Sequence, residues 1–209
     1  MRTLLDLDKW NRKEHFLFFK QMQEPFFGVT LLIDSTKAYD NAKALKTSFF
    51  IYYLHKTLIA VNAIENFRYR IDNTHIYIYD KIDGSATIAR TDGTFGFSLI
   101  EFDPDYSVFE KIALTEIERI QNTTGLLTRD FSMANLIHFS AIPWIEFTSL
   151  SHARNMAYPD SCPKISFGKM KLSEDGKRTM PMSIHVHHGL MDAQHVGQMA
   201  DYFQEIMNQ

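Results

Sequence analysis

The sequence predicts an α/β (α+β) two-layer sandwich in which helices pack on a mixed β-sheet. Two observations point to this class. Short segments in which apolar and polar residues alternate, as in half-buried strands, recur along the chain, and polar turns join several of them. Longer segments with apolar residues at helical spacing lie between them. Helices mixed with hairpin-linked strands are typical of a sheet covered by helices.

Length and composition fit one domain over residues 1–209. The 209 residues are enough to bury a core, and no linker rich in Pro, Gly or Ser divides the sequence. The net charge of -3 gives no support to nucleic-acid binding. The single cysteine, Cys162, cannot form an intrachain disulfide, and the sequence contains neither a membrane-spanning run nor an apolar leader. We therefore expect a cytoplasmic protein without membrane contact.

The first 64 residues predict two helices on either side of a strand. The first helix is expected over Asp8–Met22, because Pro25 follows soon after it. A strand is expected over Gly28–Asp34. One long helix is expected over Asp40–Ile64. The apolar side chains near helical spacing in this helix are Leu45, Phe49, Tyr52, Leu58 and Val61.

The middle of the chain predicts strands followed by one helix. A hairpin is expected over residues 67–79, with a polar turn at Asp72-Asn73-Thr74. Further strands are expected over Thr87–Arg90 and Phe95–Phe102. An amphipathic helix is expected over Tyr106–Ile120, and Thr123-Thr124-Gly125 ends it.

The last third predicts three strands and a C-terminal helix. The strands are expected over Leu136–Ile142, Ile165–Leu172 and Met182–His188, and the turn Glu174-Asp175-Gly176-Lys177 connects the last two. The helix begins at Asp192. Its apolar residues at helical spacing are Val196, Met199, Ala200, Phe203 and Ile206.

The end of the last strand places a histidine where it can act as a base. Alternation puts His188 on the apolar face with Ile184 and Val186, and His185 and His187 on the other face. A helix N-terminus follows directly. Histidine takes up and returns a proton near neutral pH, so a rigid, partly dry His188 is our candidate general base.

Three segments carry a family resemblance. His188-x-x-x-Asp192, followed by Ala193, resembles the His-x-x-x-Asp-Gly motif of CoA-dependent acyltransferases. The segments WNRKEHF at Trp10–Phe16 and FSAIPWI at Phe139–Ile145 resemble segments found at comparable places in chloramphenicol acetyltransferases. The three segments occur in the family's order and span nearly the whole chain, so the chain resembles a member of the chloramphenicol acetyltransferase family.

The resemblance implies a fold, a reaction and an assembly. The fold would be CoA-dependent acyltransferase-like, and the reaction would be transfer of acetyl from acetyl-CoA to a hydroxyl of chloramphenicol, a reaction tied to antibiotic resistance. Attack would be direct, with His188 as base and Ser140 as donor to the developing oxyanion. Family members are homotrimers, with the histidine from one subunit and the serine from its neighbour. Ser140 and Cys162 lack the glycine setting of a nucleophile elbow, which agrees with direct attack.

The resemblance also implies supporting residues. Asp192 would pair with Arg12 and hold the histidine loop, although a helix cap and a solvated charge are the ordinary roles of these residues. Ser166 stands where the family has a threonine that binds a water, although an ordinary strand serine is as common. Phe19 and Phe27, with Phe18 and Phe26 nearby, would line an aromatic acceptor pocket, although phenylalanine clusters usually pack in a core.

Two residues depart from the family pattern. Phe19 replaces a tyrosine whose hydroxyl helps to fix the histidine, so one orienting hydrogen bond is expected to be missing. Ala193 replaces the motif glycine, which would carry a cost if that position required a positive φ.

The sequence leaves two alternatives open. The chain could catalyse the same acetyl transfer to another alcohol or thiol acceptor, or it could bind a small molecule without catalysis. The histidines near the C-terminus do not predict a metal site, because alternation separates them and no His-Glu-x-x-His run or cysteine pair completes a ligand set.

Overall fold

A mixed β-sheet forms the centre of the molecule. The structure is a computed structural model that describes residues 1–131, 133–155 and 160–209. Within them the main sheet has the strand order β2-β10-β8-β7-β5-β6, and β9 pairs with β10. β7 runs parallel to β5 and β8, whereas the other pairs are antiparallel, so the mixed sheet of the predicted fold class is confirmed. The strands are β2 (Phe26–Asp34), β5 (Asp83–Ala89), β6 (Phe95–Phe97), β7 (Leu136–Ala141), β8 (Lys164–Phe167), β9 (Lys171–Leu172) and β10 (Arg178–His187).

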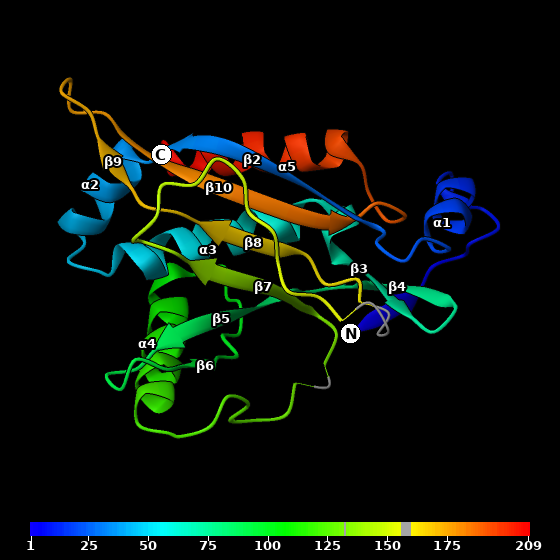
Figure 1. Cartoon of the computed structure of the whole chain (residues 1–209), viewed down its shortest axis with the longest axis horizontal. Helices are drawn as coiled ribbons and strands as arrows, with labels where there is room; N and C mark the ends of the chain where they lie inside the picture. Colours follow the sequence, from blue (N-terminus) through cyan, green and yellow to red (C-terminus); the bar gives the residue numbers. More distant parts are fainter. Residues whose placement is uncertain (132, 156–159) are drawn as a thin grey trace.

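The helices and a smaller sheet surround this centre. In Figure 1, α3 and α5 lie behind the main sheet, and α1 lies near the end of β10. The smaller sheet has the order β1-β4-β3. The remaining elements are β1 (Arg2–Leu4), β3 (Tyr69–Asp72), β4 (His75–Tyr79), α1 (Lys13–Phe19), α2 (Thr36–Ala44), α3 (Phe49–Ala63), the 3-10 helix η1 (Glu65–Arg68), α4 (Tyr106–Gln121) and α5 (Ala193–Met207).

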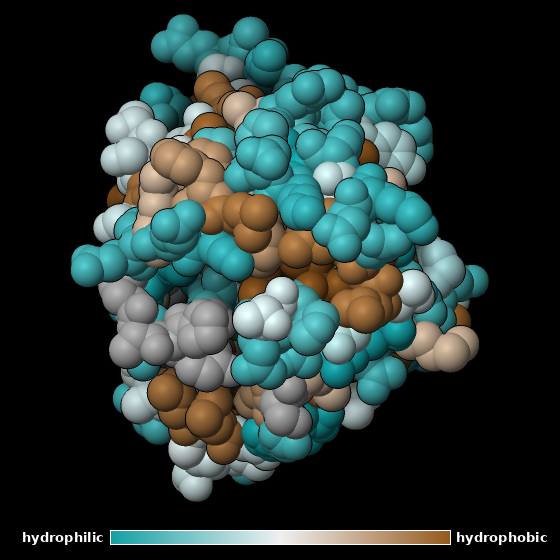
Figure 2. Space-filling model, turned by 90° about the vertical axis from the view of Figure 1, so that its right-hand side faces the viewer, coloured by the Kyte–Doolittle hydropathy of each residue, from teal (hydrophilic) through white to brown (hydrophobic). Residues whose placement is uncertain are grey.

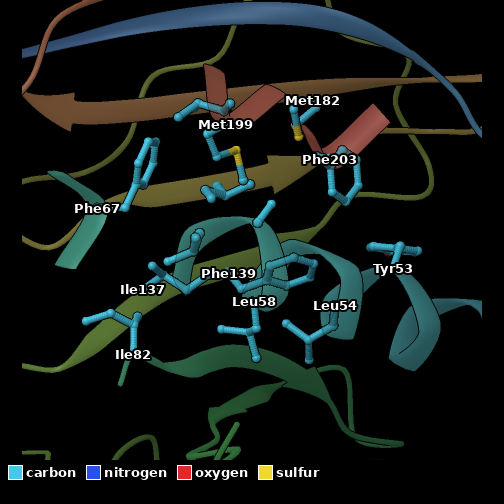
Figure 3. Close-up of a cluster of buried hydrophobic side chains, with 14 of the residues drawn as sticks. Tyr53, Leu54, Leu58, Phe67, Ile82, Ile137, Phe139, Met182, Met199 and Phe203 are labelled. Carbon is cyan, nitrogen blue, oxygen red and sulfur yellow. The ribbon is translucent and has the colours of Figure 1, made fainter. Parts of the chain in front are cut away.

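The hydrophobic core lies between the sheet and these helices. Figure 3 shows apolar side chains of α3 and α5 directed toward apolar side chains of the sheet. Burial of such side chains is the main favourable term in folding, at about 25 cal/mol per Å² of apolar surface. The labelled core residues include Leu54, Leu58, Phe139, Met182, Met199 and Phe203, each 0–1% exposed.

The opposite face of the sheet is polar and is crossed by the chain itself. Residues 142–155, in yellow, run in front of the sheet in Figure 1. His152 in this segment packs its ring edge-on against His185 of β10, with 4.8 Å between the ring centroids. We call this the outer face; it carries the residues that alternate with the core residues along each strand.

The long helix predicted over Asp40–Ile64 is wrong in its start and its continuity. The structure has two helices, α2 and α3, separated by residues 45–48. Lys46 has a φ of 56°, which ends helical geometry, and Leu45 is 60% exposed instead of lying on the core face. The hydroxyl groups of Thr47 and Tyr106 lie 2.5 Å apart and hold the connection against α4.

Several other boundaries differ from the sequence predictions. The first helix is confined to Lys13–Phe19, because the residues before it form turns in which Trp10 packs against Tyr69. The strand predicted to reach Phe102 ends at Phe97, and the one predicted to reach Leu172 breaks at Gly168. A Cβ at Gly168 would lie 2.5 Å from Pro181, so the chain approaches its neighbours closely there. The short strand β1 was not predicted.

Gly28 offers a test of the outer face. A Cβ at this position would lie 2.3 Å from Nε2 of His185, the residue paired with it on β10. We expect Gly28→Ala to destabilise the protein by about 1–3 kcal/mol, because an imidazole ring cannot yield that space without repacking. Chemical denaturation would measure this change.

A matched glycine provides the control. Nothing lies within 4 Å of a Cβ at Gly197 in α5, so Gly197→Ala is expected to stabilise the protein by roughly 0.5–1 kcal/mol. Adding His185→Ala to the Gly28→Ala protein should recover most of the loss. Equal stability of the Gly28→Ala protein and the unmodified protein would contradict the clash.

Candidate active site

Backbone hydrogen bonds from two other segments hold His188. β10 ends at His187, and His188 begins the turn that leads to α5. The His188 N–H donates to the Pro25 carbonyl at 2.8 Å, and the His188 carbonyl accepts from Nη2 of Arg12 at 3.2 Å. The residue is thus fixed at both of its peptide groups.

Two aromatic rings enclose the imidazole. The Phe19 ring stacks on the His188 ring with 4.0 Å between centroids and an angle of 13°, and the Phe27 ring lies at 4.6 Å. Nδ1 of His188 is buried and has no hydrogen-bond partner among the described residues. Ring packing therefore holds the His188 side chain on the core side of the sheet. Phe19 contacts the imidazole through its ring face and has no hydroxyl that could hydrogen-bond to it.

The other two phenylalanines lie elsewhere. Phe18 is 60% exposed, next to Phe19 on α1. Phe26 packs against His187 on the outer face. Figure 2 shows hydrophobic side chains gathered across the middle of the face that includes the α1 side of the molecule, with hydrophilic borders above and below.

An ion pair ties the N-terminal region to the start of α5. Nη1 of Arg12 lies 2.6 Å from Oδ2 of Asp192, and the Arg12 side chain is 9% exposed. Asp192 also caps α5: its side chain accepts from the Gln194 N–H, and Nδ1 of His195 accepts from the Asp192 N–H at 3.2 Å. Partial burial alone would raise the pKa of Asp192, but Arg12 and His195 lower it to about 2.

Ala193 fits its position without backbone strain. It is the first residue of α5, and the described non-glycine residues with positive φ are Lys46 and Asn73. The replacement of the motif glycine therefore carries no conformational cost from a left-handed backbone.

His187 stabilises the turn that follows β10, a role that the sequence analysis did not predict. It is 4% exposed, and its Nδ1 accepts the Gly189 N–H at 3.1 Å. Burial lowers the pKa of His187 to about 4, with a further contribution from the charge of Arg154. The hydrogen bond requires a free lone pair on Nδ1, so the buried ring and the turn geometry both favour the neutral imidazole.

The two candidate serines lie side by side on the outer face. Ser140 of β7 pairs with Ser166 of β8, and Ser166 pairs with Ser183 of β10. Ser166 is 1% exposed, and its hydroxyl is buried without a partner among the described residues. An unpaired buried hydroxyl carries a cost that a water or a ligand can remove.

The structure does not bring Ser140 and His188 together within one chain. His188 lies five residues beyond Ser183 on the antiparallel strand, or about 16 Å at 3.3 Å per residue, and two strand spacings add about 10 Å sideways. The two residues are thus roughly 19 Å apart. Proton transfer and oxyanion stabilisation need contacts near 3 Å.

Two features are absent from the part of the chain that the structure describes. No group of three or more His, Cys, Asp or Glu there is arranged to hold a metal ion. Likewise, none of the helices in this part of the chain has the length and apolar character that crossing a membrane requires.

Comparison with known proteins identifies the family. A family model described as chloramphenicol acetyltransferase matches residues 1–204. The chain belongs to the chloramphenicol acetyltransferase family. Its relatives include a chloramphenicol acetyltransferase of Bacillus pumilus, 28% identical over 93% of this chain and 89% of the relative, and chloramphenicol acetyltransferase 3 of Escherichia coli, 27% identical over 99% and 97%.

Solved structures agree with this membership. A chloramphenicol acetyltransferase structure superposes with a TM-score of 0.90 and 29% identity, covering 99% of this chain and 100% of the other. A dihydrolipoamide acetyltransferase of Azotobacter vinelandii superposes with a TM-score of 0.70 at 13% identity, covering 93% and 86%. The second comparison shows a shared fold alone. The predicted acyltransferase fold is therefore confirmed. As a member of this family, the protein is an acyltransferase.

The Arg12–Asp192 pair can be tested by a double-mutant cycle. Arg12→Met leaves a partly buried carboxylate without its partner, and we expect a loss of about 1–3 kcal/mol in unfolding free energy, since Asp192 remains a third exposed. Asp192→Asn keeps a helix cap and should lose less. The double variant should be more stable than the sum of the two losses predicts; strict additivity would contradict a direct interaction.

His187 predicts a stability change with pH. Its folded pKa, about 4, lies below the ordinary histidine value of 6.5, so the folded state is favoured above pH 6.5 and loses this advantage as the pH falls toward 4. We expect about 2 kcal/mol less stability at pH 5 than at pH 7 from this group, measured by urea unfolding. His187→Asn retains an acceptor for Gly189 and should weaken the pH dependence; an unchanged slope would assign the effect to other groups.

Proposed function

We propose that the protein transfers acetyl from acetyl-CoA to a hydroxyl of chloramphenicol, with His188 as the general base. The observation that carries this proposal is the setting of His188. In a member of this family, its imidazole is clamped between aromatic rings, its Nδ1 is buried, and its backbone is fixed at both peptide groups. A base held in this way keeps its orientation without reorganisation during the reaction.

The chemistry needs one proton carrier. Since Nδ1 of His188 is buried, Nε2 is the nitrogen available to remove the hydroxyl proton as the hydroxyl oxygen attacks the thioester carbonyl. The carbon–sulfur bond then breaks, and the imidazolium returns the proton to the CoA thiolate. Ser140 donates a hydrogen bond to the carbonyl oxygen as negative charge develops there, and the Ser166 hydroxyl beside it holds a water.

We propose a homotrimer in which His188 of one chain meets Ser140 of the next. The 19 Å or so that separates the two residues within one chain supports this arrangement, because one copy alone cannot supply both groups. The residues that follow Ser140 are exposed and apolar: Trp144 is 75% and Ile145 is 57% exposed. A large exposed apolar patch is typical of an interaction surface, and contact between copies would cover it.

Four other residues support the site in this proposal. Phe19 and Phe27 form the acceptor wall beside His188. Arg12 and Asp192 position the turn that carries the base, through the ion pair and through the bond from Arg12 to the His188 carbonyl. We place the reaction in the cytoplasm, in agreement with the single unpaired cysteine.

A first experiment tests the reaction. CoA release from acetyl-CoA, with and without chloramphenicol, should be acceptor-dependent, and His188→Ala should lower kcat by at least ~10³, since general acid–base catalysis contributes about 10²–10⁴. Ser140→Ala should lower kcat by about 10² with little change in KM. CoA release only with another hydroxylated or thiol compound would support acetyl transfer and exclude chloramphenicol as the acceptor. No release with any acceptor would favour a binding protein without catalysis.

A second experiment tests the assembly. His188→Ala and Ser140→Ala chains, each nearly inactive alone, are co-expressed so that mixed trimers form. A site built by two chains should be intact in about one quarter of cases after random mixing, so activity should return to roughly that fraction. Recovery that stays at the level of the separate variants would place both residues of a site in one chain.

A further inference from the structure

A basic cavity of about 520 Å³ lies on the outer face of the sheet, near Ser140 and apart from His188. Among the described residues, its charged lining consists of Arg70, Arg154, Lys164 and Asp160, and the last two form an ion pair with each other. The lining also includes His138, the Cys162 thiol and the polar residues Ser85, Asn155 and Ser161. The acetyl-transfer chemistry proposed above uses none of these side chains.

Two lining residues of the cavity lie close to the serine pair along the strands. His138 precedes Ser140 by two residues on β7, and Lys164 precedes Ser166 by two residues on β8, so all four lie on the outer face. Residues two apart on a strand are about 7 Å apart. A molecule with a hydroxyl at Ser140 therefore reaches His138 and Lys164 with a group only a few bonds away.

The cationic groups are built into the fold. Arg70 is 1% exposed, and its guanidinium donates to backbone carbonyls of Phe67, Tyr69, Ala134 and Leu136. Among the described residues these bonds fix the group without neutralising its charge by a carboxylate. Buried charge without a counterion is costly, and a bound anion would offset that cost.

Arg154 adds an unsatisfied donor. Its side chain is 10% exposed and lies over the Phe26 ring at 3.5 Å, and it forms an ion pair with Glu24. Its Nε is buried without a partner among the described residues. A planar guanidinium with a free N–H suits carboxylate and phosphate oxygens.

Cys162 reports the electrostatic field inside the cavity. Burial opposes ionisation of its thiol, but His138, Arg70 and Lys164 outweigh this effect, and the pKa of Cys162 is lowered. Cys162 as a whole residue is half-buried. A field that favours a thiolate at this point also favours the oxygen anions of a ligand.

We propose that this cavity binds a carboxylate or phosphate group on a hydroxylated acceptor whose hydroxyl lies at Ser140; the proposal rests on the acetyl transfer proposed above. Chloramphenicol carries no anionic group, so the cavity selects a class of acceptor beyond it. Arg70, whose hydrogen bonds among the described residues go to backbone carbonyls, supplies the charge, Lys164 shares its charge with Asp160, and Arg154 supplies a directed N–H.

The thiol allows a test that does not depend on acetyl transfer. Cys162 is the one cysteine of the chain, so alkylation of the intact protein reports this cavity alone. The ratio of the rates with iodoacetate and iodoacetamide should be roughly tenfold higher for Cys162 than for N-acetylcysteine at low salt, and should fall in high salt. A ratio equal to that of N-acetylcysteine, or no reaction with either reagent, would overturn the proposal.

Variants assign the effect to the cavity. Lys164→Met removes one cationic group and should lower the rate ratio by at least about threefold. Lys171→Met changes a lysine that is 64% exposed on β9 and is not among the described lining residues, so it should leave the ratio unchanged. Equal effects of the two substitutions would indicate a general surface field and overturn the proposal.

Small probes distinguish the two anionic groups. Glycerate and glycerol 3-phosphate carry a hydroxyl and an anion, whereas glycerol carries hydroxyls alone. Slower alkylation with glycerate identifies a carboxylate site, slower alkylation with glycerol 3-phosphate identifies a phosphate site, and equal behaviour of all three overturns the proposal. If an anionic probe slows alkylation of Cys162 but the protein releases no CoA in the acetyl-transfer assay, the anion site is supported and the proposed acetyl transfer is rejected.

Discussion

The ion pair between Arg12 and Asp192 is the contact on which the rest of the proposed site depends. It joins the turn before α1 to the N-terminus of α5, 180 residues later in the chain. The same guanidinium holds the His188 carbonyl, and the same carboxylate caps α5. Because one pair acts at once on the helix start and on the histidine turn, the position of the base and the docking of the N-terminal segment are coupled. The low pKa of Asp192, about 2, keeps this carboxylate charged at any pH where the protein is expected to work.

The sheet separates two kinds of chemistry by alternation. Toward α3 and α5 its side chains are apolar and buried, and they form the rigid layer against which the end of β10 is set. Away from the helices, the same strands present serines at one level and His138, Lys164 and His185 at the next. Residues 142–155 cross this outer face (Figure 1), where His152 packs against His185 and Arg154 lies over Phe26. A ligand on this face would thus contact a surface whose shape is fixed by the core behind it.

The predictions that held rest on local patterns. The hairpin over β3 and β4, the helix α4 and the C-terminal helix follow from alternation, helical spacing and turn residues, and each lies within a residue or two of its predicted bounds. The predictions that failed concern the residues at which a helix or a strand is interrupted. Lys46 takes a left-handed conformation although nothing in the residue type requires it, and Gly168 ends a strand because Pro181 lies close by. Such breaks are set by contacts between distant segments.

The sequence by itself determined the fold class and the motif with His188 and Asp192, because strand alternation, helical spacing and fixed residue order are properties of neighbouring residues. Only the tertiary structure decided which groups meet. It set Phe19 and Phe27 around His188 and separated Ser140 from that histidine by roughly 19 Å. It also gathered Arg70, His138, Cys162 and Lys164 around one cavity. The physical reason is that packing and charge act through space, between strands and loops whose order along the chain does not reveal their neighbours.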